Sequence, residues 1–416
     1  MAEELEKLIN GEREGNEIKL HGTIRLHLKK GGSFTVGAVC VKGAIRITRP
    51  NTVIDGSDAE LIVEVEDCTT SDWALFLIQP SARNVRFQNL RLRVHIQNQV
   101  ATTRRFSLFY NTAYGVQFEH CSMEVCSERQ LNLAGIYNNG NLDTHMETRA
   151  DNLVVSNCFI KAECLAEQFP KECRVYGLYN YLANSISVQN TYIYATNRGE
   201  GERQQAIGVY TNGRFGRFVG NNIKANGTHN IGLEKEQAYT YGFINEGLYT
   251  IITSNNIIGE WAGKCVGLQT DGEYAIISSN KVLATHTICG RSIVSQGNYS
   301  KIEGNILTST SRNARLLEHD AANCVITNNI MEILMGQEEC GSGCAIYAAG
   351  DNCYGNIISE NMIRNVKDAG LFLNHEAGTV LNNMVVSYRG TVERAWRDDA
   401  AMLMKLDERR IRSIIK

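Results

Sequence analysis

A short phrase returns along most of this 416-residue chain. A glycine or another small residue precedes an apolar one, a polar turn and a β-rich run follow, and an Asn then comes before another hydrophobic residue. Successive copies read GIYNNG…SNCFI, GVYTNG…GNNIK, GFINEG…SNNII and GLQTDG…SSNKV. The Asn residues that mark the copies are Asn157, Asn190, Asn222, Asn256, Asn280, Asn305, Asn329, Asn361 and Asn383. Their spacing of roughly 22 to 34 residues is typical of a solenoid, in which each repeat forms one coil.

The coils are built from short strands without a helix between them, which argues against the leucine-rich type of repeat. Stacking such coils at about 4.8 Å gives parallel strands that hydrogen-bond from coil to coil. The recurring Asn then forms an internal ladder, because Asn tolerates a left-handed corner and its amide can bond the coils above and below. The 3 prolines and 37 glycines fit short strands and tight corners.

The x-N-N-x-I motif, the coil length and the capping segments resemble the right-handed parallel β-helix of the pectin-lyase-like superfamily, over roughly residues 50–390. The resemblance implies an all-β solenoid of roughly a dozen coils, with the handedness that parallel crossovers prefer. We expect an N-terminal cap over residues 1–52, with a helix at 2–10 and a strand at 17–28, a β-helix domain over 53–390, and a C-terminal capping helix over 391–416. The architecture hosts lyases, hydrolases, epimerases, fructotransferases and tailspikes, so the fold leaves the activity open.

Numbering the six residues of the phrase from its small first residue gives a map of the surface. Because side chains alternate along a strand, position two points inward, and positions one, three and five point outward. Position two holds Phe76, Leu108, Ile136, Leu178, Val209, Phe243, Leu268, Ile293, Leu316, Ile346 and Leu371. Position three holds Phe109, Tyr137, Tyr179, Tyr210, Ile244, Gln269, Val294, Leu317, Tyr347 and Phe372. These rings either stack along the sheet or are covered by loops or another subunit, or they form a platform for sugar rings.

Position five carries the candidate catalytic groups. It holds Asn111, Asn139, Tyr181, Asn212, Glu246, Asp271, Gln296, His319 and Asn374. Adjacent coils would place Glu246 beside Asp271 at about 4.8 Å, so that one pKa rises and a proton donor lies next to a charged base or nucleophile. His319 would lie two coils further on, and Arg315 breaks the rule of small residues at position one. The alternative is that these are solvent-facing turn residues, as the Thr-Asp-Gly context of Asp271 indicates.

Long excursions after the Asn strand, at roughly 94–106, 161–175, 195–206 and 225–238, would wall this face into a groove. The predicted substrate-binding residues are Tyr137, Tyr179, Tyr181, Tyr210, Asn212, Gln269, Gln296 and Trp261. Trp261 interrupts a corner before the Asp271 coil and serves either as a sugar platform or as a cap or subunit contact.

No metal site or cofactor is predicted. Asp143, His145 and Glu147 would share a face of an extended segment, but such a trio in a polar loop is usually solvated. Cys340 and Cys344 have the spacing of a metal-ligand pair, but no second such pair accompanies them. We therefore interpret the thiols of the 13 cysteines as structural.

The leading functional hypothesis is a carbohydrate-active enzyme that cleaves or rearranges a glycosidic bond of an oligosaccharide. Glu246 and Asp271 would be the acid and the base or nucleophile, and Arg315 and His319 would shape the site. The coils at 290–294 and 315–317 resemble the inulin-fructotransferase group, which implies a hydrolase or an intramolecular transferase. A polysaccharide lyase acting on uronates is the alternative, and would need a basic residue and charge neutralisation. A non-catalytic glycan-binding or structural β-helix is the third hypothesis.

Net charge and hydropathy limit the kinds of partner that this chain can bind. The net charge of −3 offers no basic footprint for nucleic acid, and no apolar run is long enough to span a membrane. The acidic N-terminus lacks the features of a signal peptide, which predicts a cytoplasmic protein, or a secreted one if a signal peptide has been removed. Because bare β-helices associate along their flanks, we also expect a homo-oligomer, a trimer.

Overall fold

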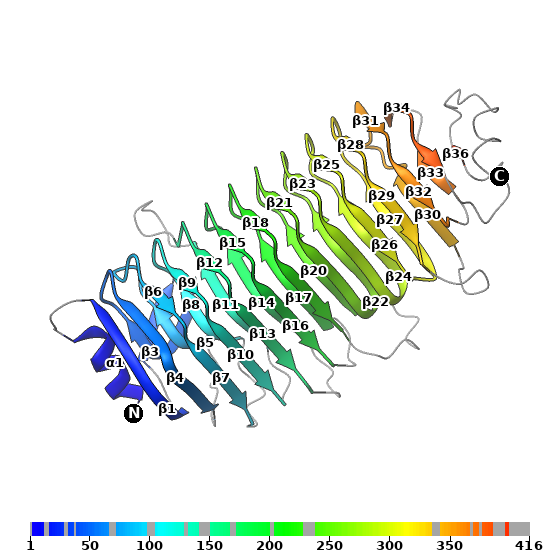
Figure 1. The fold of residues 1–416 in the computed structure, drawn as a ribbon. Helices are drawn as coiled ribbons and strands as arrows, with labels where there is room; N and C mark the ends of the chain where they lie inside the picture. The colour runs from blue at the N-terminus through cyan, green and yellow to red at the C-terminus, as the bar shows by residue number, and fades with distance from the viewer. Residues whose placement is uncertain are drawn as a thin grey trace. The chain divides into compact units, whose positions relative to one another are not determined.

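The computed structural model describes residues 2–11, 16–28, 32–36, 39–65, 72–97, 105–128, 132–140, 150–166, 172–199, 204–227, 238–334, 342–366, 369–373, 377–385 and 396–398. The chain divides into two compact units, Met1–Thr228 and His229–Lys416. Within each unit, strands of successive coils pair in parallel and form three sheets, here named sheets A, B and C in the order in which a coil visits them. Figure 1 shows the strands side by side, coil after coil. Both units are all-β solenoids, which confirms the predicted fold class.

In the N-terminal unit, sheet A carries the repeated phrase, sheet B the short strand after it, and sheet C the strand that closes the coil. Sheet A contains β3 (Val39–Ile47), β5 (Asp72–Ile78), β8 (Phe106–Asn111), β11 (Leu133–Asn139), β14 (Cys173–Tyr181) and β17 (Gln204–Thr211). Sheet B contains β6 (Arg86–Gln88), β9 (Gln117–Glu119), β12 (Val154–Ser156), β15 (Ser187–Gln189) and β18 (Arg217–Val219). Sheet C contains β7 (Arg91–Ile96), β10 (Ser122–Ser127), β13 (Phe159–Cys164), β16 (Tyr192–Asn197) and β19 (Asn222–Asn226). The long β4 (Val53–Val65) pairs with both β6 and β7.

The C-terminal unit repeats this plan, with two long strands that turn from sheet C into sheet A. These are β22 (Asn256–Thr270) and β24 (Lys281–Ser295). Sheet A also contains β20 (Tyr239–Asn245), β27 (Asn313–His319), β30 (Ser342–Ala348), β33 (Ala369–Leu373) and β36 (Trp396–Asp398). Sheet B contains β21 (Ile251–Thr253), β23 (Ile276–Ser278), β25 (Lys301–Glu303), β28 (Val325–Thr327), β31 (Asn356–Ser359) and β34 (Gly378–Leu381). Sheet C also contains β26 (Ile306–Ser309), β29 (Ile330–Ile333), β32 (Met362–Arg364) and β35 (Met384–Val385).

The core of the N-terminal unit is an aromatic ladder. Phe76 and Phe109 stack in sheet A with ring centroids 5.0 Å apart, and Phe87 and Phe118 stack in sheet B, also at 5.0 Å. The two pairs meet edge to face, the favoured geometry for buried rings. The sequence predicts that Phe109 points outward and Leu108 inward. Phe109, however, pairs with Ile136 at position two, so Phe109 is the inward residue of its coil and Leu108 comes one residue before it.

The sequence predicts that position one of the phrase points outward, but in the structure it does not. A Cβ added at Gly177 would collide with the Ile193 side chain and with the Gly208 carbonyl oxygen of the next coil. The strand ladders skip this residue, as between Ala134 and Ile136, so the strand bends there. The position is small because two coils approach closely, and not because it faces solvent.

The corner between sheets B and C uses two consecutive residues, where the sequence predicted one. The first has a left-handed backbone; these residues are Asn89, His120, Asn157, Asn190, Gly220, Ser254, Ser279, Gly304, Asn328, Glu360 and Asn382. The next residue points inward and forms the ladder. In the C-terminal unit the amide of Asn305 donates to Asn329 Oδ1 at 3.0 Å and to the carbonyl of Ile277 at 2.9 Å.

The internal ladder is thus confirmed for Asn280, Asn305, Asn329, Asn361 and Asn383. The prediction is wrong for the other four Asn residues. Asn157 and Asn190 occupy the left-handed position, while Asn222 and Asn256 follow the actual ladder residues Asn221 and Asn255. In the N-terminal unit Cys121, Cys158 and Thr191 take ladder positions, so thiols and a hydroxyl replace the amide.

The N-terminal segment contains a helix and a strand at the positions expected for them. The helix α1 (Ala2–Asn10) buries Leu5 and Ile9, and β1 (Glu17–Leu28) pairs with β4 as a layer of the stack. The antiparallel strand β2 (Gly32–Val36) pairs with β3. In the C-terminal segment residues 396–398 form the strand β36, which pairs in parallel with β33, while residues 391–395 and 399–416 lie outside the described part, so the C-terminal cap stays a prediction. None of the helices described is long and apolar enough to cross a membrane.

Candidate active site

The register of sheet A in the C-terminal unit decides which side chains share an outward column. Asn245 pairs with Thr270, Thr270 with Ser295, and Ser295 with His319. The residues that follow these four, one in each coil, are Glu246, Asp271, Gln296 and Asp320. Glu246 and Asp271 therefore lie on adjacent coils as predicted, and Asp320 takes the place predicted for His319.

His319 is an interior residue and was placed wrongly. It is 1% exposed, in the inward column with Ser295, and burial lowers the pKa of its imidazole. The error is a slip of one residue, because Leu316 stands where other coils have a glycine or serine. Leu317, and not Leu316, pairs with Ile293, so Glu318 replaces Leu317 at position three.

The two carboxyl groups of the candidate pair have different surroundings. Glu246 is exposed, whereas Asp271 is half-buried. Gln269 donates from Nε2 to Asp271 Oδ2 at 2.9 Å, while Asp271 Oδ1 is buried without a hydrogen-bond partner. Burial raises the pKa of Asp271 and the Glu246 charge adds to the rise, although the Gln269 hydrogen bond opposes it. The arrangement therefore places a carboxyl group with a raised pKa beside an exposed one.

Arg315 belongs to an ion-pair array beside this column. It was predicted at position one but pairs in register with Arg291, one residue before the actual position one, which Leu316 occupies. Both guanidinium groups contact the Glu318 carboxylate, Arg291 through Nε and Arg315 through Nη1 at 3.2 Å. Burial alone would raise the pKa of Glu318, but Arg291, Arg315 and Lys264 together lower it. Arg315 also lies 3.7 Å from the ring centroid of Tyr347.

A stack of tyrosines occupies sheet A of the N-terminal unit. Successive centroids of Tyr110, Tyr137, Tyr179 and Tyr210 are 4.7, 4.7 and 4.6 Å apart, and the rings are nearly parallel. Each inner ring has both faces covered by its neighbours, so aromatic stacking along the sheet is confirmed. Tyr137 and Tyr179 have no free face for a sugar ring, and any role of theirs in binding would use the hydroxyl groups.

Arg105, which is not among the site residues predicted from the sequence, lies over this stack. Its guanidinium carbon is 4.3 Å from the Tyr137 centroid and 5.3 Å from that of Tyr179. Its Nε is buried without a hydrogen-bond partner. Burial by itself would lower the pKa of Arg105, but the tyrosines and Asp72 outweigh it and raise the pKa. Arg105 lies just before the phrase, outside the six positions that can be aligned from coil to coil, so the repeat could not identify it.

The other predicted binding residues are scattered. Tyr181 stacks on Tyr179 at 6.1 Å, and Asn212 Oδ1 accepts a hydrogen bond from the Leu182 backbone at 2.6 Å. Gln296 is exposed in the carboxylate column. Trp261 has a left-handed backbone and stacks on His286 at 4.2 Å. The stacked His286 fits the interpretation of Trp261 as a corner cap.

Among the described residues, no group of three or more His, Cys, Asp or Glu side chains is arranged so that it could hold a metal ion. Asp143, His145, Glu147 and Cys340 lie outside the described ranges. So do residues 98–104, 167–171, 200–203 and 228–237 of the predicted loop walls. The described cysteines, including Cys344, are free thiols.

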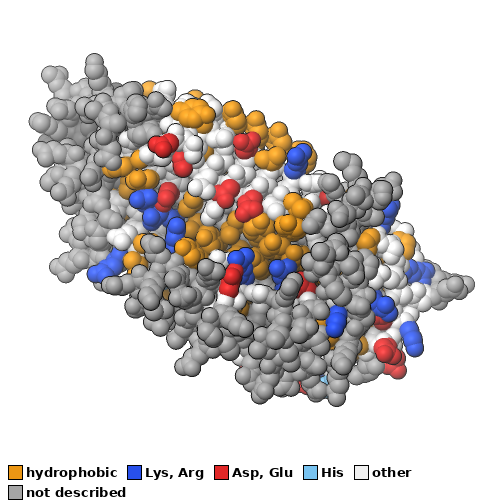
Figure 2. Space-filling view, turned by 180° about the vertical axis from the view of Figure 1, so that it is seen from behind, with side chains coloured by type: hydrophobic (Ala, Val, Ile, Leu, Met, Phe, Trp, Pro, Cys, Tyr) orange, Lys and Arg blue, Asp and Glu red, His pale blue; other side chains and the backbone are white. Residues whose placement is uncertain are grey.

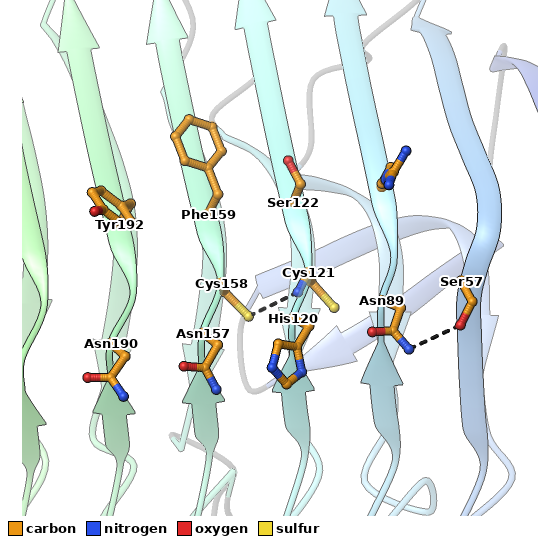
Figure 3. A pocket seen from close by; sticks show the side chains of 11 residues that line it. Ser57, Asn89, His120, Cys121, Ser122, Asn157, Cys158, Phe159, Asn190 and Tyr192 are labelled. Carbon is orange, nitrogen blue, oxygen red and sulfur yellow. Dashed lines mark hydrogen bonds between the residues drawn. The ribbon is translucent and has the colours of Figure 1, made fainter.

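A groove of about 550 Å³ at the corner between sheets B and C of the N-terminal unit was also missed. Figure 3 shows its two rows of side chains, one from the corners, where all but Ser57 have a left-handed backbone, and one from the starts of the sheet C strands. The corner row is Ser57, Asn89, His120, Asn157 and Asn190, and the strand row is Arg91, Ser122, Phe159 and Tyr192. The repeat predicts Asn157 and Asn190 in the internal ladder, whereas both line this groove.

Comparison with known proteins gives fold-level likeness. No family model and no curated protein sequence matches the chain. Among solved structures, the A-module of the Azotobacter vinelandii mannuronan C-5 epimerase AlgE6 aligns with a TM-score of 0.52 and 10% identity, covering 93% of this chain and 92% of that one. A DFA-IIIase from Arthrobacter chlorophenolicus A6 aligns at 0.45 and 12%, covering 86% and 78%. The Dettilon tailspike protein aligns at 0.41 and 14%, covering 84% and 63%.

Proposed function

We propose that this chain, which has the pectin-lyase-like parallel β-helix fold, is an enzyme that cleaves or rearranges a glycosidic bond on sheet A of its C-terminal unit. The supporting observation is the Asp271 carboxyl group, which is half-buried beside Glu246, has a raised pKa and leaves one oxygen unpartnered. A protonated carboxyl next to an ionised one is the pairing that glycoside cleavage uses. The fold shared with a mannuronan epimerase supports a glycan as the substrate class.

In the proposed reaction, Asp271 gives its proton to the leaving glycosidic oxygen while Glu246 attacks the anomeric carbon. The resulting glycosyl ester is released by water in hydrolysis, or by a hydroxyl of the same sugar chain in rearrangement, with the Asp271 carboxylate now accepting the proton. Coils about 4.8 Å apart favour this double displacement over direct attack by water, which needs a wider gap between carboxyl groups. Gln269 holds Asp271 in orientation through its Nε2 hydrogen bond.

The residues bordering the pair give the sugar its polar contacts. Gln296 is exposed in the next coil of the column and is free to meet hydroxyl groups. Arg291 and Arg315 are held by Glu318, so their orientation is fixed before a substrate arrives. This array carries more positive than negative charge, and it would favour a glycan that bears an acidic group near the cleaved bond.

Arg105 supports a second candidate, an enzyme acting on a uronate-containing glycan in the N-terminal unit. A buried guanidinium with an unpartnered Nε among tyrosine hydroxyls is suited to neutralising a uronate carboxylate, the step that makes the adjacent C–H acidic. The charge of Arg105 also opposes the rise that burial causes in the Tyr137 pKa. A lyase of this kind would leave a 4,5-unsaturated uronate, which a hydrolase or transferase does not.

Substitution of the carboxylates tests the proposal. Glu246→Gln and Asp271→Asn should each lower turnover of inulin-type or mannuronate oligosaccharides by about a thousandfold or more, since each removes a group that acts in the transition state. Glu303→Gln is the matched control, because Glu303 pairs with Lys301 on sheet B of the same unit. Products are separated by chromatography and scanned for ultraviolet absorption by an unsaturated uronate. Unchanged turnover in both carboxylate variants would exclude this site. Unsaturated products that disappear in Arg105→Ala would favour the second candidate.

A further inference from the structure

The corner groove of the N-terminal unit is lined by polar side chains, and three of those in its corner row have no hydrogen-bond partner among the described residues. Asn89 bonds Asp55 Oδ1 and Ser57 Oγ, both at 3.1 Å, and so serves the turn. The side chains of His120, Asn157 and Asn190 make no such bond to the described residues, although their backbone N–H groups bond the next coil. Figure 3 shows all three in one row. Left-handed corners need only glycine or serine, as Gly220 and Ser254 show, so these longer polar groups are not required by the fold.

The second row of the groove adds an aromatic ring and a cation. Tyr192 is 51% exposed and stacks on none of the other described rings, in contrast to the tyrosines of sheet A. Phe159 lies beside it in register, tilted 41° against Tyr194. Arg91, which also lines the groove, is exposed. Tyr192 thus offers the free ring face that a sugar needs, together with its hydroxyl.

The chemistry of the groove excludes several kinds of ligand. Its strands are paired on both sides, β10 with β7 and β13, so a peptide cannot join as an added strand. Among the described lining residues, Arg91 and His120 are the basic ones, which is too little charge for a nucleic-acid backbone. Amides and an imidazole that repeat at about 4.8 Å suit an extended chain rich in hydroxyl groups.

We infer that this corner groove binds an extended oligosaccharide that lies along the stacking direction of the N-terminal coils. Asn157, Asn190 and His120 bond its hydroxyl groups, Tyr192 stacks on one sugar ring, and Arg91 favours an acidic sugar at its end of the groove. The groove contains neither Asp271 nor Glu246, so it is a non-catalytic binding site for a glycan.

Glycine substitutions test this inference without disturbing the backbone. Asn157 and Asn190 have φ angles of 53° and 49°, which glycine adopts freely, so Asn157→Gly with Asn190→Gly removes two amides and keeps the corners. Asn328→Gly, at the equivalent corner of the C-terminal unit with φ of 57°, is the matched control. Calorimetric titration uses mannuronate and inulin-type oligosaccharides, on a background of Glu246→Gln and Asp271→Asn that prevents turnover.

We expect the double glycine variant and Tyr192→Ala each to weaken binding about tenfold, which corresponds to about 1.4 kcal/mol, with Asn328→Gly unchanged. Arg91→Gln should weaken mannuronate binding alone. A dissociation constant unaffected in the glycine and Tyr192 variants, or no binding of either oligosaccharide, would overturn the inference. Either result leaves the proposed activity intact, because turnover of short substrates is measured separately in the chain with native carboxylates. An unchanged melting temperature confirms that the variants fold.

Discussion

At the scale of single residues, Asp271 should set the pH dependence of turnover. It acts as the proton donor only while protonated, so kcat should fall as pH rises through its raised pKa. The charge of Glu246 contributes to the rise. Neighbouring negative charge should therefore also shift the descending limb of the profile, because it favours the protonated form.

The profile can be tested by adding a negative charge without removing a catalytic group. Gln296→Glu places a carboxylate in the next coil of the column, and we expect its descending limb to move to higher pH by about half a unit. A full kcat profile, measured from acid to neutral pH, checks the prediction. Gln296→Met serves as the uncharged control. An unmoved limb in Gln296→Glu would show that Asp271 is not the titrating acid.

Asp271 should also lower stability at neutral pH. A carboxyl whose folded-state pKa is raised stabilises the fold fully below its unfolded-state pKa, and that contribution is lost as pH rises through the folded-state value. Asp271→Asn removes the ionisation, so its melting temperature should exceed that of the native chain by about 1–2 °C at neutral pH, and by less in acid. Calorimetry at several pH values measures this. A variant less stable than the native chain at neutral pH would contradict the raised pKa.

At the scale of elements, the Asn ladder should be the costliest part of the corner to break. Asn305 accepts hydrogen bonds from the backbone and the amide of Asn280, and donates to Asn329 and the Ile277 carbonyl. Asn305→Ala would leave several buried polar groups unpaired, at a cost of about 3 kcal/mol or more. Chemical denaturation should show this loss, with Asn328→Gly close to native. Equal stabilities of the two variants would mean that the ladder is dispensable.

Strands and their register were predictable only where the phrase is regular. Coils with a glycine at position one, such as those of Gly242 and Gly267, placed Glu246 and Asp271 correctly, because the glycine marks the bend. The coil with Leu316 in that place was misread by one residue, and a slip of one moves every side chain to the opposite face. That slip placed His319 outside when it lies in the core. Arg105 and the corner groove depend on how coils meet, which a single repeat does not encode.

At the scale of the molecule, the repeat was enough to predict an all-β solenoid, because each coil can bury its apolar face only against the next. The caps do not follow the repeat, so the repeat says little about them. The helix at 2–10 is present, and residues 396–398 form a strand that pairs with β33 where the sequence predicts a helix, while the other residues of 391–416 lie outside the described part. The trimer stays a prediction. Exposed Tyr249, Tyr274 and Tyr299 stack in a row. Figure 2 shows apolar side chains gathered on one face of the molecule.

The most direct test of the proposed activity is a crystal structure of the Asp271→Asn chain soaked with a mannuronate or inulin-type oligosaccharide. The account predicts density for a sugar chain across sheet A of the C-terminal unit. A glycosidic oxygen should lie within hydrogen-bond distance of residue 271, and the Glu246 carboxylate should face the anomeric carbon. Two results would contradict the proposed activity. One is sugar density on the tyrosine stack beside Arg105, and the other is sugar density in the corner groove while sheet A of the C-terminal unit stays empty.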